Sequence, residues 1–93
     1  MDAPASIHVV VEGLVQGVSF RWHTRRTAQE LNLRGWVRNR SDGSVEVMAA
    51  GEATQVDQLV EWLHQGPPSA RVDGVRILPD ALPVDDGPFR IVH

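Results

Sequence analysis

The chain passes from a predicted strand into a predicted helix through the segment V-E-G-L-V-Q-G-V-S-F-R, residues 11–21. Upstream, residues 6–12 alternate between two sets of side chains with the period of a strand that has one face in a core. Downstream, apolar and small residues recur at helical spacing, which predicts a helix from near Val18 or Ser19 to near Asn32. The segment therefore places a glycine-containing loop between a strand and the N-terminus of a helix.

This loop has the features of an anion-binding site. Gly13 and Gly17 allow the backbone to take positive φ angles or to approach a ligand closely, so several N–H groups can point into one concavity. The first N–H groups of the following helix have no intrahelical partner, and the helix dipole is positive at this end. Arg21 adds a planar, charged set of donors. We therefore expect the loop and Arg21 to bind a phosphoryl group.

The rest of the sequence continues with strand and helix patterns. Further strands are predicted at 35–39, 45–49, 73–78 and 88–92, with a hairpin turn at 41–43 and a second helix through 56–63 that stops at 66–68. The order strand, helix, strand, strand, helix, strand, with a short strand at the end, predicts an α+β, ferredoxin-like split βαβ sandwich. We expect an antiparallel sheet of four to five strands with two helices on one face.

The length and composition narrow the class of protein. The 93 residues suit one domain and no linker divides them, so we expect a single domain over residues 1–93 with a flexible N-terminus at 1–5. The absence of cysteine excludes a disulfide framework, a thiolate nucleophile and a thiolate metal site. No basic region is followed by a long apolar run, so the sequence predicts a cytoplasmic protein without a signal peptide or membrane span.

The charged residues exclude some classes of enzyme and argue against one class of binding protein. All nine lysine or arginine positions are arginine, which excludes the lysine of a GxxxxGK phosphate loop and a Schiff-base lysine. The formal net charge of −3 argues against broad, charge-driven binding to nucleic acid. A local basic site remains compatible with this composition.

Two stretches of the chain together resemble the sequence signatures of the acylphosphatase family. They are V-E-G-L-V-Q-G-V-S-F-R at 11–21 and G-W-V-R-N-R-S-D-G-S-V at 35–45, with a further glycine at Gly51. Two long motifs at a suitable separation are far more specific than a lone pair of glycines. The resemblance implies a small, metal-independent hydrolase that cleaves the carboxyl-phosphate anhydride of acyl phosphates. It also implies an enzyme that needs no cofactor, acts as a monomer and has inorganic phosphate as product and inhibitor.

The resemblance assigns roles to residues at the matching positions. Arg21 matches the family's phosphate-binding arginine, and Asn39 matches the asparagine that positions the attacking water. The family's phosphate-binding loop corresponds to Gly13, Leu14, Val15, Gln16, Gly17 and Val18, which we call the phosphate-loop segment. Without the resemblance, the residues alone favour a solvated arginine in a first helical turn for Arg21 and a turn-favouring residue at a strand end for Asn39.

We expect no catalytic role for the other polar residues that could carry chemistry. His23 has the chemistry of a nucleophile or general base, but it lies outside the matching motif positions. Asp42 and Glu46 fall in and just after the hairpin turn, which favours structural roles. The remaining histidines lack the spacing and acidic partners of metal ligands, so we expect no metal site and surface or interfacial positions for them. They are His8, His64 and His93.

Two alternative functions remain open at this point. One is a non-enzymatic ferredoxin-like module that binds phosphate or a phosphorylated ligand. The other is an RRM-like RNA-binding module, which is disfavoured because the central strands lack adjacent exposed aromatic residues and the net charge is negative. Hydrolysis of an acyl phosphate favours the enzyme, anion binding without hydrolysis favours the first alternative, and a salt-dependent RNA shift favours the second.

Overall fold

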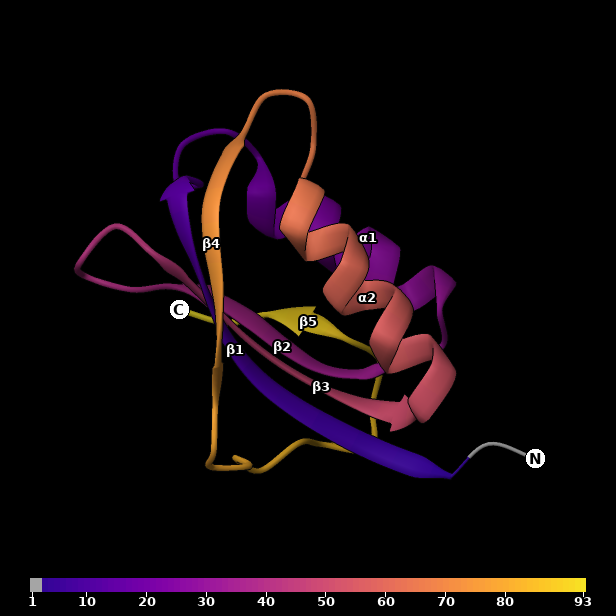
Figure 1. Ribbon diagram of the computed structural model, residues 1–93. Helices are drawn as coiled ribbons and strands as arrows, with labels where there is room; N and C mark the ends of the chain where they lie inside the picture. The colour runs from indigo at the N-terminus through magenta and orange to yellow at the C-terminus, as the bar shows by residue number, and fades with distance from the viewer. Residues whose placement is uncertain (1–2) are drawn as a thin grey trace.

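The computed structural model describes residues 3–93 and contains one sheet covered by two helices on the same face (Figure 1). The elements in chain order are β1 (Pro4–Leu14), α1 (Phe20–Glu30), β2 (Arg34–Asn39), β3 (Val45–Glu52), α2 (Ala53–Gln65), β4 (Arg71–Leu78) and β5 (Arg90–Ile91). The strand order is β4-β1-β3-β2-β5. The predicted α+β, ferredoxin-like architecture is confirmed, because two βαβ halves interleave their strands in one sheet.

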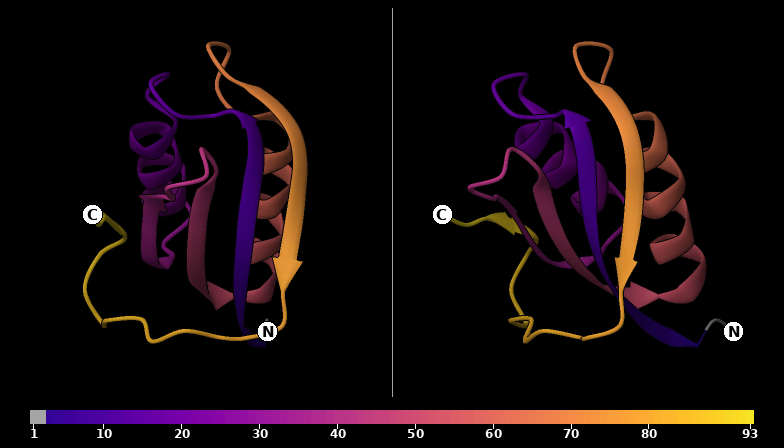
Figure 2. Two further views of the ribbon diagram at one scale, coloured as in Figure 1. Left: turned by 90° about the vertical axis from the view of Figure 1, so that its left-hand side faces the viewer. Right: turned by 60° about the vertical axis from the view of Figure 1, so that its left-hand side comes forward.

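The last strand differs from the predicted arrangement. The four long strands pair antiparallel, whereas β5 pairs parallel with β2, with Val37 opposite Ile91. The sheet is therefore mixed rather than wholly antiparallel. The reason is that residues 79–88 carry the chain from β4 at one edge of the sheet to β2 at the other, where it enters in the direction of β2 (Figure 2).

Strand β1 starts earlier than the alternation in the sequence indicated. Pro4 and Ala5, which were assigned to a flexible N-terminus, lie opposite Glu52 and Gly51 in β3. The backbone N–H of Ala53 also donates to the carbonyl of Ala3. This pairing exists because β3 continues through Gly51 to Glu52, beyond the predicted strand at 45–49. Residues 1 and 2 of the predicted flexible segment lie outside the described residues.

The core lies between the sheet and the two helices. Helix α2 contributes Val56, Leu59 and Leu63, which recur at helical spacing and are at most 3% exposed. Helix α1 contributes Phe20 and Ala28. From the sheet face below them come alternate residues of the central strands, as a period of two requires. The buried core consists of Val9, Val11, Val15, Phe20, Ala28, Leu33, Val37, Val45, Val47, Ala49, Val56, Leu59, Leu63 and Phe89.

The opposite face of the sheet is also covered. His8 Nδ1 lies 2.8 Å from the carbonyl oxygen of Asp80, and Trp36 Nε1 donates to the carbonyl of Pro83 at 3.2 Å. The prediction that His8 lies at the surface or in an interface is therefore wrong, since its side chain is buried beneath residues 79–88. Alternation in β1 separates His8 from Val9 and Val11, which belong to the core, but it carries no information about what covers the face of His8.

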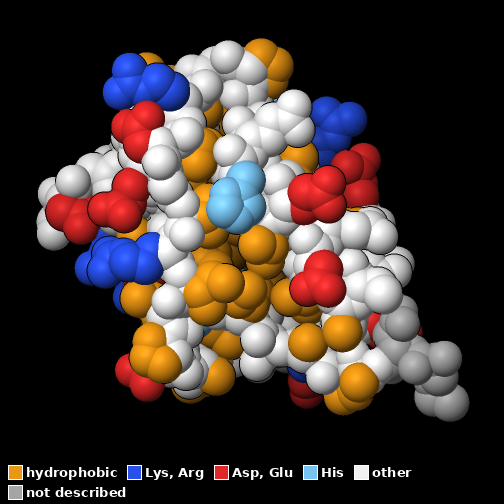
Figure 3. Space-filling view, in the orientation of Figure 1, with side chains coloured by type: hydrophobic (Ala, Val, Ile, Leu, Met, Phe, Trp, Pro, Cys, Tyr) orange, Lys and Arg blue, Asp and Glu red, His pale blue; other side chains and the backbone are white. Residues whose placement is uncertain are grey.

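One face of the molecule carries arginines that are not gathered in one area. On the face shown in Figure 3, the basic side chains lie apart from one another, with acidic groups nearby and apolar groups in the centre. Six arginines have a carboxylate oxygen within 4.0 Å, namely Arg26, Arg34, Arg38, Arg71, Arg76 and Arg90. The described residues therefore form no continuous basic surface on the face shown in Figure 3.

Candidate active site

The junction between β1 and α1 takes its shape from residues with positive φ. Gly17 has φ 76°, and Ser19, the residue before the first helical position, has φ 61° in the left-handed region. Ser19 makes no side-chain hydrogen bond that caps the helix, and the first turn of α1 contains no acidic residue. Within residues 3–93 no capping side chain occupies the first N–H groups of α1, which leaves them available to an anion.

Gly13 has a different structural task. It lies at φ 133° where the pairing between β1 and β4 shifts register. A Cβ atom there would collide with the backbone carbonyl of Arg71 and lie 2.8 Å from the backbone nitrogen of Asp73. Glycine is therefore needed for the close approach of β4. Gly13 and Leu14 border a hollow with Arg71 and Asp73 that is separate from the pocket described below.

Gln16 connects the phosphate-loop segment to the β2–β3 turn. Its side-chain amide donates to the carbonyl of Arg40 at 2.7 Å and to the carbonyl of Ser44 at 2.8 Å. Asp42 in turn accepts from the backbone N–H of Ser44 at 3.0 Å. Hydrogen bonds from the hydroxyl and the backbone of Ser44 hold the pKa of Asp42 below its ordinary value. Asp42 thus serves the turn, as the sequence indicated.

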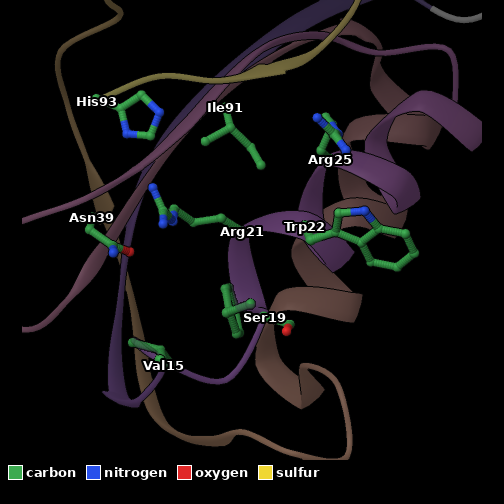
Figure 4. Close-up of a pocket in the computed structure, with 10 residues that line it drawn as sticks. Val15, Ser19, Arg21, Trp22, Arg25, Asn39, Ile91 and His93 are labelled. Atoms are coloured by element: carbon green, nitrogen blue, oxygen red, sulfur yellow. The ribbon is translucent and has the colours of Figure 1, made fainter.

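Arg21 and Asn39 line one open pocket of about 610 Å³. Arg21 extends from the first turn of α1 toward Asn39, which stands at the end of β2 (Figure 4). Val15 and Gly17 of the phosphate-loop segment line the same pocket. The structure thereby brings parts of both sequence motifs together.

The other residues of the phosphate-loop segment do not border this pocket through their side chains. The Gln16 side chain is directed to the β2–β3 turn, as described above. Val18 packs against the core, and its carbonyl accepts a hydrogen bond of 2.8 Å from Ser69 Oγ. The segment is therefore anchored on two sides, by the turn and by the loop before β4.

Several residues of the pocket were not among the sequence candidates. Ile91 and His93 reach it because β5 pairs with β2, an association that local patterns do not reveal. Arg25 follows Arg21 by four residues, the spacing that places two side chains on one helical face, so this signal was present in the sequence. Ser19, Phe20 and Trp22 complete the lining.

The remaining histidines and Glu46 lie elsewhere. The His23 ring packs edge-on against Trp22, with ring centroids 4.9 Å apart, and does not line the pocket. Glu46 accepts hydrogen bonds from Arg38 at 2.7 Å and His8 at 2.6 Å on the opposite face of the sheet. Burial alone would raise the pKa of Glu46, but these bonds outweigh it and hold the pKa below its ordinary value.

Two further properties concern metals and membranes. Within residues 3–93, no three histidine, aspartate or glutamate side chains come together as a metal-ligand group. Over the same range, both helices are too short and too polar to cross a membrane.

Comparison with known proteins agrees with this fold. The model of the acylphosphatase family matches residues 7–91. An acylphosphatase of Acaryochloris marina is 52% identical over 84 residues, which cover 90% of this chain and 86% of the relative. An acylphosphatase of Anaeromyxobacter sp. is 48% identical and covers 96% of both chains. The solved structure of an acylphosphatase from Coxiella burnetii superposes with a TM-score of 0.85 at 46% identity, covering 96% of this chain and 93% of that one.

The chain belongs to the acylphosphatase family. It is accordingly an acylphosphatase enzyme that acts on small-molecule acyl phosphates. This assignment favours the enzyme over the two alternatives that the sequence left open.

Proposed function

We propose that the pocket hydrolyses acyl phosphates by direct, in-line attack of water, in which Arg21 and the phosphate-loop segment bind the phosphoryl group and Asn39 positions the water. The observation that supports this proposal best is the shared pocket of Arg21 and Asn39, which come from separate motifs and separate elements. Val15 and Gly17 place the phosphate-loop segment at the same pocket.

Arg21 is suited to hold the phosphoryl group. Its guanidinium offers planar donors that can contact two phosphoryl oxygens at once. Within residues 3–93 no carboxylate lies within ion-pair distance of Arg21, although six other arginines have such a partner. The guanidinium is therefore free for an anionic substrate. The uncapped N-terminus of α1 adds backbone donors at the same place.

Asn39 is suited to orient a water molecule. Its amide presents one acceptor oxygen and a donor nitrogen on a short side chain, so it can accept from the water and fix its direction. The residue ends β2, and Gln16 ties the turn just after it to the phosphate-loop segment. The distance between the water-positioning group and the phosphoryl-binding group is thus restrained by the fold.

The reaction then needs one displacement. The water oxygen forms a bond to phosphorus while the bond between phosphorus and the acyl oxygen breaks on the opposite side. The acyl oxygen leaves within a carboxylate, and a proton of the water passes to a non-bridging phosphoryl oxygen. A carboxylate is a good leaving group, so positioning and charge stabilisation suffice without a covalent phosphoenzyme.

Hydrolysis of benzoyl phosphate by single variants tests the proposal. Arg21→Ala should lower both inorganic phosphate affinity and turnover, whereas Asn39→Ala should retain phosphate affinity and lose turnover by about 10² to 10³, as for removal of one well-placed group. Arg34→Ala is a matched control, because Arg34 also lies on β2 but pairs with Asp86 at the surface. Near-normal turnover by Asn39→Ala would remove the water-positioning role. An equal loss in Arg34→Ala would assign the effect to β2 instead.

A further inference from the structure

Arg25 is a second arginine of the pocket that has no carboxylate partner within the described residues. Of the nine arginines in the chain, six have ion pairs. Arg40 lies near enough to Asp42 to lower the pKa of that carboxyl, after the larger effects of the hydrogen bonds from Ser44. The two that remain within residues 3–93 without an acidic neighbour, Arg21 and Arg25, both line the pocket.

The position of Arg25 separates it from the phosphoryl-binding end. It follows Arg21 by one helical turn on α1, so the Cβ atoms of the two residues are about 5–6 Å apart. In Figure 4, Ile91 lies between His93 and Arg25, while Arg21 extends toward Asn39. Trp22 lines the pocket next to Arg25. The pocket thus has one cationic end near Asn39, a second near Trp22, and an apolar side chain between them.

We infer that Arg25 is a specificity-determining residue that binds a second anionic group on the acyl chain, so that the preferred substrates are acyl phosphates of dicarboxylic type. This inference rests on the proposed function, because it takes the phosphoryl group to occupy the site of Arg21 and Asn39. The methylene groups of a short chain then lie against Ile91, and the distal carboxylate meets the guanidinium of Arg25. A charged, half-buried arginine without an ion-pair partner among residues 3–93 supplies the donors that this carboxylate needs.

The ratio of kcat/KM for succinyl phosphate to kcat/KM for butyryl phosphate measures this role. The two substrates have the same four-carbon chain, and only the first has a distal carboxylate. The wild-type enzyme should prefer succinyl phosphate, and Arg25→Gln should lower the ratio roughly fivefold, the size of an ion pair with a partly exposed arginine. Glutamine keeps the helix propensity and much of the side-chain volume.

Arg26→Gln is the matched control. Arg26 is the next residue on α1, and its replacement by glutamine removes the same charge. It pairs with Glu30 at 3.8 Å and does not line the pocket. Its ratio should stay at the wild-type value. An unchanged ratio in Arg25→Gln, or an equal fall in Arg26→Gln, would overturn the inference, because Arg25 would then act on the phosphoryl group or only through the general charge of α1.

Kinetics of the Arg21→Ala variant distinguish an error in the proposed function from an error in the role of Arg25. If Arg21→Ala hydrolyses butyryl phosphate as fast as the wild type, the phosphoryl-binding site itself is misassigned. If Arg21→Ala is impaired and the wild type shows no preference for succinyl phosphate, the proposed function stands and the role of Arg25 is refuted.

Discussion

The side-chain amide of Gln16 donates a 2.7 Å hydrogen bond to the backbone carbonyl of Arg40, the residue directly after Asn39. A second bond from the same amide reaches the carbonyl of Ser44 at 2.8 Å. The two motifs of the chain are therefore joined by a side chain as well as by the sheet. This connection restrains the phosphate-loop segment relative to the strand end that carries Asn39.

Replacing Gln16 should impair catalysis more than binding. Gln16→Met keeps the side-chain length but removes both donors, so the distance between the phosphate-loop segment and Asn39 becomes less restrained. We expect kcat to fall about tenfold, because small misplacements of positioned groups are costly, with a smaller change in inorganic phosphate affinity. The measurements are benzoyl phosphate kinetics and phosphate titration. Gln58→Met, at an exposed position of α2, is the control, and wild-type kcat in Gln16→Met would contradict the expectation.

Replacement by alanine should change the stability of the fold differently at Gly13 and at Gly74. In Gly13→Ala the new Cβ meets the backbone of β4, and the φ of 133° is unfavourable for alanine, so we expect a loss of at least about 2 kcal/mol in the free energy of unfolding. Gly74 is on β4 itself, and a Cβ there meets no atom of the described residues within 4 Å. Gly74→Ala should therefore be neutral or slightly stabilising. Denaturant unfolding of both variants decides this, and similar losses in the two would argue against the collision.

The stability of the fold should decrease in acid in part through Glu46. The pKa of Glu46 is held below its ordinary value of 4.5 by Arg38 and His8 despite burial, so the ionised form is favoured in the folded state. Its contribution to stability is full above that ordinary value and is lost as the pH falls through the lower pKa of the folded protein. Glu46→Gln should flatten this part of the pH dependence. Denaturant midpoints between about pH 7 and pH 3 measure it, and parallel curves for the two proteins would contradict the role of Glu46.

A chelator should leave hydrolysis unchanged. In the proposed mechanism, Arg21 and backbone N–H groups supply the positive charge that faces the phosphoryl oxygens, so no divalent cation is required for that role. Benzoyl phosphate turnover with and without EDTA tests this. A loss with EDTA that added Mg²⁺ or Zn²⁺ restores would show that a metal takes part.

Local sequence patterns were sufficient for the order of the elements. Period-two alternation indicated β1, helical spacing of Val56, Leu59 and Leu63 indicated α2, and the glycines marked the turns. These signals succeed because they depend on residues near one another in the chain. The two motifs also directed attention to Arg21 and Asn39, which the structure places in one pocket. Their catalytic roles remain predictions for the experiments above.

Signals of this kind failed where distant segments meet. Alternation set His8 and Val9 on opposite faces of β1. The path of residues 79–88 determines that the face of His8 is covered, and the register between β1 and β3 brings His8 to Glu46. Likewise, the short β5 has too few residues to indicate its partner, and its parallel pairing with β2 brings Ile91 and His93 to the pocket.

The sequence by itself determined the family, the succession of strands and helices, and the residues that carry the two motifs. The tertiary structure alone decided that Ile91 and His93 share a pocket with Arg21, and that Gln16 joins the motifs through the β2–β3 turn. The physical reason is that periodicity reports which side chains share a face of one element, whereas a pocket depends on which faces of different elements come together.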